Sequence, residues 1–231
     1  MKKILTTAIL CAGLVGFTAC DSFLDEEPKS SLTLDTYYKT SADIIGNVNY
    51  LYRDGAPDKM GNMTGAYRGS SLSVMNMVTG YFVNEYEGQE VDCSYARQLT
   101  RQNFTQSCCN YLTNDTWKGC YKSINVANAV IKYVDGVEMD GQAQYKAEAR
   151  FFRALNYFYL VKMFGDVPMI TEPTEDATLV EYPARTAASE VYKTVIIPDL
   201  QFAVENLPDA TFAGNSHRVT KYAADMLLAD V

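Results

Sequence analysis

Two long stretches of helical periodicity in the middle of the chain constrain its fold most strongly. From Asp115 to Val134, apolar side chains recur every three or four residues, which predicts a helix that buries one continuous face. Asn114 or Asp115 can cap its start, and Gly136 can close its end. The residues that share this face are Trp117, Cys120, Tyr121, Ile124, Ala127, Asn128, Ile131 and Val134.

The second stretch, 142–164, carries large apolar side chains on nearly every side. A helix with so little polar surface is expected to be covered by more than one neighbour. Gly165 and Pro168 follow it and should stop it sharply. The two stretches together predict a mainly α-helical fold.

A shorter helix is expected before them. Ser41 can act as its N-cap, and the apolar positions up to about Asp54 fall on one face. The region 55–113 differs, because Gly, Ser, Asn and Gln are frequent and helical periodicity is weak. We expect a long, mostly irregular region there, with one helix near 70–78. Long loops of this kind are often functional.

Two more helices are expected towards the end of the chain. The pattern over 188–206 contains Pro198, which should kink or split the helix, with Asp199 starting the second part. The last helix begins near Thr220 and has no stop signal before the chain ends. The sequence therefore looks cut, either as a fragment or as a truncated gene product.

The amino-terminal residues indicate export. Lys2 and Lys3 precede the short apolar run Ile4–Phe17, which is too short to span a bilayer as a stable helix. Such a segment is typical of a removable secretory signal. Two forms of cleavage are open, an ordinary one near Ala19 and one at a bacterial lipobox. In the second, which the small residues before Cys20 and the acidic sequence after it favour, Cys20 becomes the first mature residue and carries the lipid. We expect residues 1–19 to be the signal peptide and 20–36 a lipid-anchored tether.

The charge of the chain limits the classes of partner that it is expected to bind. The formal net charge is −8, and loss of Lys2 and Lys3 with the signal would make it more negative still. An acidic chain repels nucleic acid, so no nucleic-acid partner is expected.

Beyond the signal and Cys20, four cysteines remain, and the absence of a CxxC pair makes a zinc site improbable. We expect a buried thiol at Cys120, and the disulfide pairing stays open among Cys93, Cys108, Cys109 and Cys120.

The sequence does not suggest an enzyme. It has one histidine, His217, and no P-loop, HExxH or GxSxG motif. Glu85 and Glu87 could in principle act on a glycosidic bond, but nothing distinguishes them from surface charge. We expect no catalytic residue, no metal and no cofactor.

A ligand face is expected within 81–95. Sugars are bound by aromatic rings that stack on their C–H surfaces and by planar polar side chains that bind their hydroxyls. The alternative is that Tyr81 and Phe82 pack beneath the loop. The candidate contacts are Tyr81, Tyr86 and Tyr95 for stacking and Asn84, Glu87 and Gln89 for hydrogen bonds.

Other conspicuous side chains are better explained by structure. The helical phase of Trp117 favours the core over a sugar platform. Arg150 and Arg153 lie one turn apart in an apolar helix, so a salt bridge or a carbonyl contact is expected of them. Asn125 and Asn128 should satisfy backbone groups between helices.

Several motifs in this order resemble one family. They include Trp117–Tyr121 (WKGCY), Ala147–Ala154 (AEARFFRA), Phe164–Pro168 (FGDVP) and Arg218–Lys221 (RVTK), after a lipobox followed by Leu24-Asp25. In combination, they are similar to the N-terminal part of the SusD/RagB family of surface nutrient-binding lipoproteins. The resemblance covers nearly the whole mature chain.

The resemblance implies a mainly α-helical fold of tetratricopeptide-like helical hairpins with long irregular loops, here over 37–231. It implies a lipid-anchored protein at the outer membrane that faces outward. The implied partner is a TonB-dependent transporter of the SusC/RagA type, over which the protein closes like a lid after capturing a glycan or oligosaccharide. No catalysis is implied.

Family members are considerably longer than this chain, and their C-terminal half supplies further helices and part of the ligand face. Three alternatives therefore stand beside glycan capture. They are a helical-repeat scaffold for protein interactions, a peptide-binding member of the same family, and a non-functional truncated remnant.

Overall fold

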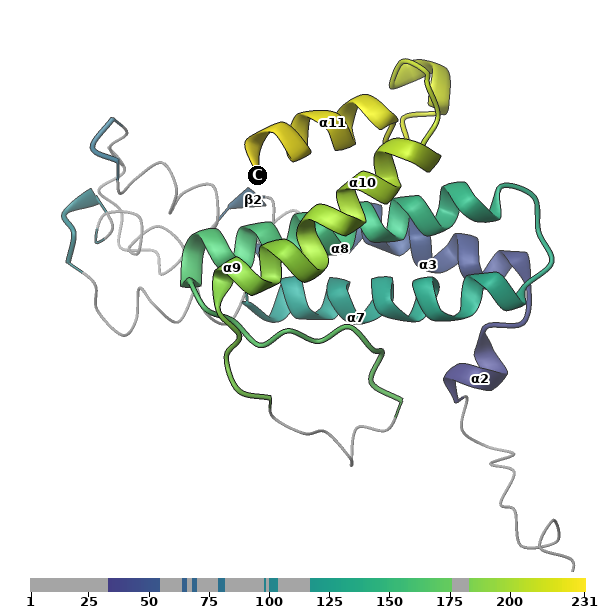
Figure 1. Cartoon of the computed structure of the whole chain (residues 1–231), viewed down its shortest axis with the longest axis horizontal. Coiled ribbons are helices and arrows are strands. Elements are labelled where there is room, and N and C mark those ends of the chain that lie inside the picture. Colours follow the sequence, from purple (N-terminus) through teal and green to yellow (C-terminus); the bar gives the residue numbers. More distant parts are fainter. Residues whose placement is uncertain are drawn as a thin grey trace, which may run out of the picture. The chain divides into compact units, whose positions relative to one another are not determined.

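The fold is that of a computed structural model, which describes residues 33–54, 64–65, 68–69, 79–81, 98, 100–103, 117–175 and 183–231. Its centre is an antiparallel pair of long helices, α7 (Lys118–Tyr133) and α8 (Gln142–Phe164) (Figure 1). A 3-10 turn, Val134–Gly136, ends the first helix where Gly136 was expected to close it. The predicted bounds of α8 are confirmed, and Gly165 ends it with a φ of +68°. The caps expected at Asn114 or Asp115 lie outside the described residues.

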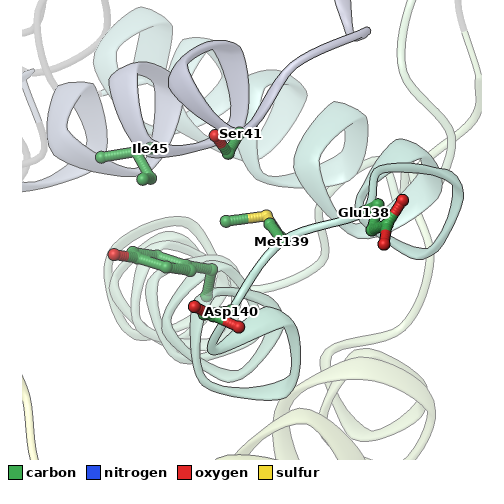
Figure 2. Close-up of a pocket in the computed structure, with 6 residues that line it drawn as sticks. Ser41, Ile45, Glu138, Met139 and Asp140 are labelled. Atoms are coloured by element: carbon green, nitrogen blue, oxygen red, sulfur yellow. The ribbon is translucent and has the colours of Figure 1, made fainter.

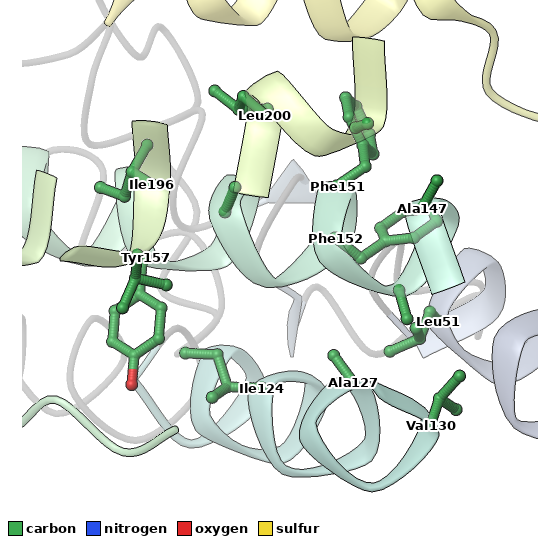
Figure 3. Packing of buried hydrophobic residues seen from close by; sticks show 14 of the residues in the cluster. Leu51, Ile124, Ala127, Val130, Ala147, Phe151, Phe152, Tyr157, Ile196 and Leu200 are labelled. Carbon is green, nitrogen blue, oxygen red and sulfur yellow. The ribbon is translucent and has the colours of Figure 1, made fainter. Parts of the chain in front are cut away.

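Further helices pack against this pair and against one another. The helix α3 (Ser41–Asp54), which follows the short α2 (Leu34–Tyr37), packs against both α7 and α8. The helix α10 (Ile197–Asn206) packs against α8, and α11 (Lys221–Asp230) packs against α10. Figures 1 and 3 show α8 between α7 and α10. The structure is therefore mainly α-helical, as the sequence predicts.

The core confirms that α8 is covered on more than one side (Figure 3). Buried side chains of α8 meet α3, α7 and the α9–α10 segment, and Tyr157 is fully buried among them. Burying one large apolar side chain stabilises a fold by about 1.5–3 kcal/mol, so each large buried side chain of α8 contributes on this scale. Labelled members in Figure 3 are Leu51, Ile124, Ala127, Val130, Ala147, Phe151, Phe152, Tyr157, Ile196 and Leu200.

The cap of α3 lies one residue earlier than predicted. Ser41 is the first helical residue, and Thr40 caps the helix instead. The Asp43 N–H donates to Thr40 Oγ1 at 3.4 Å, while the Thr40 N–H donates to Asp43 Oδ2 at 2.8 Å. This reciprocal pair is a capping box with an aspartate in the third helical position. Thr40 and Ser41 both carry a hydroxyl group that could cap the helix. Thr40 is the cap because Asp43, three residues later, can bind back to its N–H.

Pro198 was expected to kink or split its helix, and the regular α-helical pattern is interrupted directly before it. The helix α9 (Ala188–Val191) continues into a π-helical turn, Tyr192–Ile196, and then into α10. Pro198 lies in the first turn of α10, so the change from π- to α-helical hydrogen bonding occurs next to the one residue in this segment that has no N–H to donate. The prediction that Asp199 starts the second part is wrong, because α10 begins at Ile197 and Asp199 is buried.

Two short strands and a 3-10 turn also occur among the described residues. Two strands of two residues, β1 (Thr64–Gly65) and β2 (Arg68–Gly69), pair antiparallel within the region expected to be irregular. The helix expected near 70–78 lies outside the described residues. A 3-10 turn, Ala213–Asn215, lies between α10 and α11. Among the described residues, no helix is both long enough and apolar enough to cross a membrane.

Candidate functional site

Of the predicted ligand contacts, the structure describes Tyr81. It ends a turn in which Gly80 has a φ of +80°, and its own N–H donates to Thr79 Oγ1 at 3.3 Å. The side chain is 89% exposed, so it does not pack beneath the loop. An exposed tyrosine ring on a turn is suited to stacking on an apolar ligand face. The remaining predicted residues and Phe82 lie outside the described residues: Asn84, Tyr86, Glu87, Gln89, Tyr95 and the lipid-attachment candidate Cys20.

Trp117 packs within the helical body, as its phase predicts. Its ring lies 5.0 Å from that of Tyr121 and 5.1 Å from that of Phe164, centroid to centroid. The guanidinium of Arg185 lies 6.0 Å from the indole centroid. On the same face, Cys120 is a fully buried free thiol, and burial raises its pKa to about 12. This prediction of a buried thiol is confirmed.

Arg153 forms the structural salt bridge that was expected. Its Nε and Nη2 donate to the two carboxylate oxygens of Asp199 at 2.6 and 2.9 Å. Arg150 contributes more weakly, because its Nε lies 3.8 Å from Asp199 Oδ1 and its guanidinium stacks on Phe202. Nη1 of Arg153 donates to Asn128 Oδ1 at 2.9 Å, so one buried polar chain joins α10, α8 and α7.

Asn125 and Asn128 of α7 were expected to bind backbone groups between helices. They do bind backbone groups, but these groups belong to the segment that follows α8. Asn128 Nδ2 donates to the carbonyls of Ile170 and Glu172 at 3.0 and 3.2 Å, and Asn125 Oδ1 accepts the N–H of Thr174 at 2.7 Å. The Tyr157 hydroxyl accepts the N–H of Ile170 at 2.7 Å and donates to its carbonyl at 2.9 Å. Side chains thus hold this segment along the helices.

The sequence analysis missed a second buried ion pair. Arg218, before α11, donates through Nη2 to Glu148 Oε2 at 2.6 Å, and its Nε lies 3.0 Å from both carboxylate oxygens. The Tyr52 hydroxyl donates to Glu148 at 2.9 Å and accepts the N–H of Val219 at 2.9 Å. The guanidinium carbon lies 4.9 Å from the ring centroid of Tyr52 and 5.3 Å from that of Tyr145. The available sequence signal was a glutamate within an apolar helix, because a carboxylate that becomes buried there needs a partner, although the sequence does not name that partner.

These observations describe an α-helical protein of packed helical hairpins, with an exposed tyrosine on a turn that precedes the central helices in sequence. The family described as "Starch-binding associating with outer membrane", a SusD-like family, matches residues 22–231. The chain therefore belongs to the SusD-like family.

Individual relatives agree with this assignment. SusD-like protein P2 of Formosa agariphila is 31% identical over 92% of this chain and 40% of its own length. A SusD-like protein of Bacteroides ovatus is 29% identical over 99% of this chain and 38% of its own length. The chain thus spans about two fifths of the length of the curated relatives it matches.

Solved structures share the fold. A laminarin binding SusD-like protein has a TM-score of 0.67 and 25% identity, over 84% of this chain and 40% of that chain. A SusD superfamily protein from Parabacteroides distasonis has a TM-score of 0.61 and 26% identity, over 81% and 38%. The tetratricopeptide-like helical architecture that the resemblance implied is thereby confirmed.

Proposed function

We propose that this chain belongs to a surface lipoprotein that captures neutral glycans or oligosaccharides for import. The observation that carries the proposal is the family match, which extends over almost the whole chain after the signal segment. A neighbour of the same fold is named for laminarin binding, which gives the proposal its first test ligand. We infer no catalytic step, because capture for import requires binding alone.

The ligand face is proposed on the loop that carries Tyr81. Its exposed ring supports stacking on the C–H surface of a sugar, and the amide and carboxylate side chains that follow in sequence would bind hydroxyls. In this proposal Tyr86 and Tyr95 add rings, and the polar contacts come from Asn84, Glu87 and Gln89.

The remaining parts of the proposal concern location and partner. Residues 1–19 serve as the signal peptide, Cys20 carries the lipid, and 20–36 tether the body to the outer membrane, facing outward. The description of the family supports an association with the outer membrane. A TonB-dependent transporter of the SusC/RagA type receives the ligand. In this proposal, residues 37–231 form a SusD-like N-terminal domain.

Isothermal titration calorimetry of the purified full chain with laminarin tests glycan capture. Tyr81→Ala should weaken binding about two- to tenfold, because one aromatic stacking contact contributes about 0.5–1.5 kcal/mol. Phe212→Ala is the matched control, since Phe212 is also an exposed aromatic, at 59%, and lies outside the proposed face. Equal weakening by both variants would refute the face, and no saturable binding to laminarin or to a panel of other neutral glycans would refute capture.

The anchor is tested separately. Cys20→Ala should abolish incorporation of labelled palmitate and move the protein from the membrane fraction to the soluble fraction. A Cys11→Ala variant is the control, because Cys11 lies within the proposed signal peptide. Unchanged fractionation of Cys20→Ala would refute lipid attachment at this residue.

A further inference from the structure

The two connections on either side of α8 are held differently. The connection before it, from α7 to α8, contributes Glu138, Met139 and Asp140 to the lining of a surface pocket (Figure 2). The connection after it runs along α7 (Figure 1), and side chains of α7 and α8 bind its backbone. We call residues 167–175 of this connection the strap.

The strap is held mainly through hydrogen bonds to its backbone. Four side chains of α7, spaced by four, three and four positions, lie on one face of the helix and bind it. The Tyr157 hydroxyl on α8 adds bonds to the N–H and the carbonyl of Ile170. The four side chains of α7 are Tyr121, Asn125, Asn128 and Lys132.

The side chains of the strap itself bury little surface. Val167 and Pro173 are buried, and the others are half-buried or exposed. Segments with few buried apolar side chains open locally at a lower free energy than a helical core does. The strap is therefore expected to open before the helices that it lies on.

The orientation of the Asn128 amide determines whether it can bind the strap. Its Nδ2 donates to the carbonyls of Ile170 and Glu172, while its Oδ1 accepts from Nη1 of Arg153 at 2.9 Å. An amide turned over would place its oxygen against the two carbonyls and its NH₂ against the guanidinium, and neither arrangement allows a hydrogen bond. Arg153 therefore fixes the orientation in which Asn128 binds the strap.

Arg153 is in turn fixed by Asp199 on α10, which accepts from its Nε and Nη2 at 2.6 and 2.9 Å. Asn128, Arg153 and Asp199 are 1%, 8% and 2% exposed. Buried polar groups are costly to leave without partners, so a change at one of the three is felt by the next. An unbroken chain of buried hydrogen bonds thus joins α10 to the strap.

We propose that the strap is a latch whose docked state depends on Asp199 of α10, acting through Arg153 and Asn128. When the bond between Asp199 and Arg153 is disturbed, Asn128 loses its fixed orientation, and the strap leaves α7 and α8 while the helices stay packed. The latch is the two-state element that such coupling requires. Coupling is reciprocal, so a ligand that binds only the docked strap would also stabilise the Asp199–Arg153 pair. None of these residues belongs to the proposed glycan face, so the latch does not depend on glycan capture.

Hydrogen exchange of the full chain, followed by NMR, measures opening of the strap. The amides of Ile170 and Thr174 donate to Tyr157 and Asn125, so they are protected while the strap is docked. The amide of Leu160, a fully buried residue of α8, reports on opening of the helices themselves. In the parent protein, the two strap amides should exchange faster than the Leu160 amide.

Asn128→Asp tests the contact with the strap. The new carboxylate still accepts from Arg153, but it has no N–H for the two strap carbonyls. Exchange at the two strap amides should rise about tenfold or more, because two hydrogen bonds of the docked state are lost, and exchange at Leu160 should change much less. Asn125→Asp is the matched control, since the same chemical change one turn earlier keeps the oxygen that accepts the N–H of Thr174. It should leave strap exchange nearly unchanged.

Asp199→Asn tests the coupling without changing a strap contact, because the Asp199 carboxylate binds Arg153. It should speed exchange at the strap amides severalfold, and it should add little in the Asn128→Asp background, where the strap is already released. Leu200→Ala is the control, because it removes a buried apolar side chain of α10 and leaves the polar chain intact. Three results would overturn the proposal: unchanged strap exchange in Asn128→Asp, equal effects of the two asparagine variants, or an effect of Leu200→Ala on the strap as large as that of Asp199→Asn.

Discussion

Replacement of Arg218 by alanine should destabilise the protein more than an ordinary surface mutation does. Arg218 lies before α11, yet its guanidinium binds both carboxylate oxygens of Glu148 on α8 and donates to Asn49 on α3 at 2.8 Å. The side chain of Glu148 is fully buried, while that of Arg218 is 21% exposed. Removal of the cation therefore leaves a buried carboxylate with Tyr52 and Gln144 as its remaining donors.

Breaking a buried ion pair by removing one partner costs about 3–5 kcal/mol. Because Arg218 is partly exposed, water can reach the vacated space, and we expect the low end of that range, about 3 kcal/mol. For a chain of this size, this loss lowers Tm by roughly 6–12 °C. The second variant, Glu148→Gln, keeps the shape of the side chain and removes its charge. In the Arg218→Ala background, it should restore at least about 1 kcal/mol, because the uncompensated charge is then gone.

Urea unfolding followed by circular dichroism measures both effects. Hydrogen exchange adds a local readout, since the amides from 212 to 220 should exchange faster in Arg218→Ala than in the parent. Arg218→Lys keeps a charge but cannot bind both oxygens side by side, so it should fall between the parent and the alanine variant. A loss below about 1 kcal/mol, or no recovery with Glu148→Gln, would refute the reasoning.

Three further predictions follow from single contacts. Tyr157→Phe removes both hydrogen bonds to Ile170, so the Ile170 N–H loses the hydroxyl oxygen that accepts it. This variant should lower the free energy of unfolding by about 1–3 kcal/mol, as urea titrations can measure. Cys120, whose pKa is raised to about 12 by burial, should resist iodoacetamide at pH 8 and react only in denaturant, as peptide mass spectrometry can show. The hydrogen bonds from Thr40 lower the pKa of Asp43. Its contribution to stability is therefore present above the unfolded pKa of about 3.9 and is lost as pH falls through the lower folded pKa. Asp43→Asn should accordingly be less stable than the parent at neutral pH, and the gap should narrow below about pH 4; a constant gap would contradict this cause.

The sequence predicted the long helices well because their signals are local. The bounds of α8 follow from a strong apolar pattern and from Gly165, which takes the positive φ that ends the helix. The salt bridge of Arg153 was also foreseeable, because a cation in an apolar helix needs a partner. Its partner, Asp199, was misassigned as a helix start, since a proline next to an aspartate suggests a cap.

Long-range pairing could not be predicted in the same way. Glu148 and Arg218 lie 70 positions apart, and neither has a local pattern that names the other. The π-helical turn Tyr192–Ile196 likewise has no sequence signature beyond the nearby proline. Of the predicted ligand face, the structure describes Tyr81, and the contacts expected after it stay predictions.

Binding of fluorescent laminarin to intact cells tests the central claim most directly, because it requires surface exposure, anchoring and glycan capture together. Cells that produce the full chain should bind the glycan saturably. Cells that produce Cys20→Ala in equal amount should lose that binding, since the protein is then released. No binding by the parent, or equal binding by the Cys20→Ala cells, would contradict the account of a lipid-anchored glycan-capture protein.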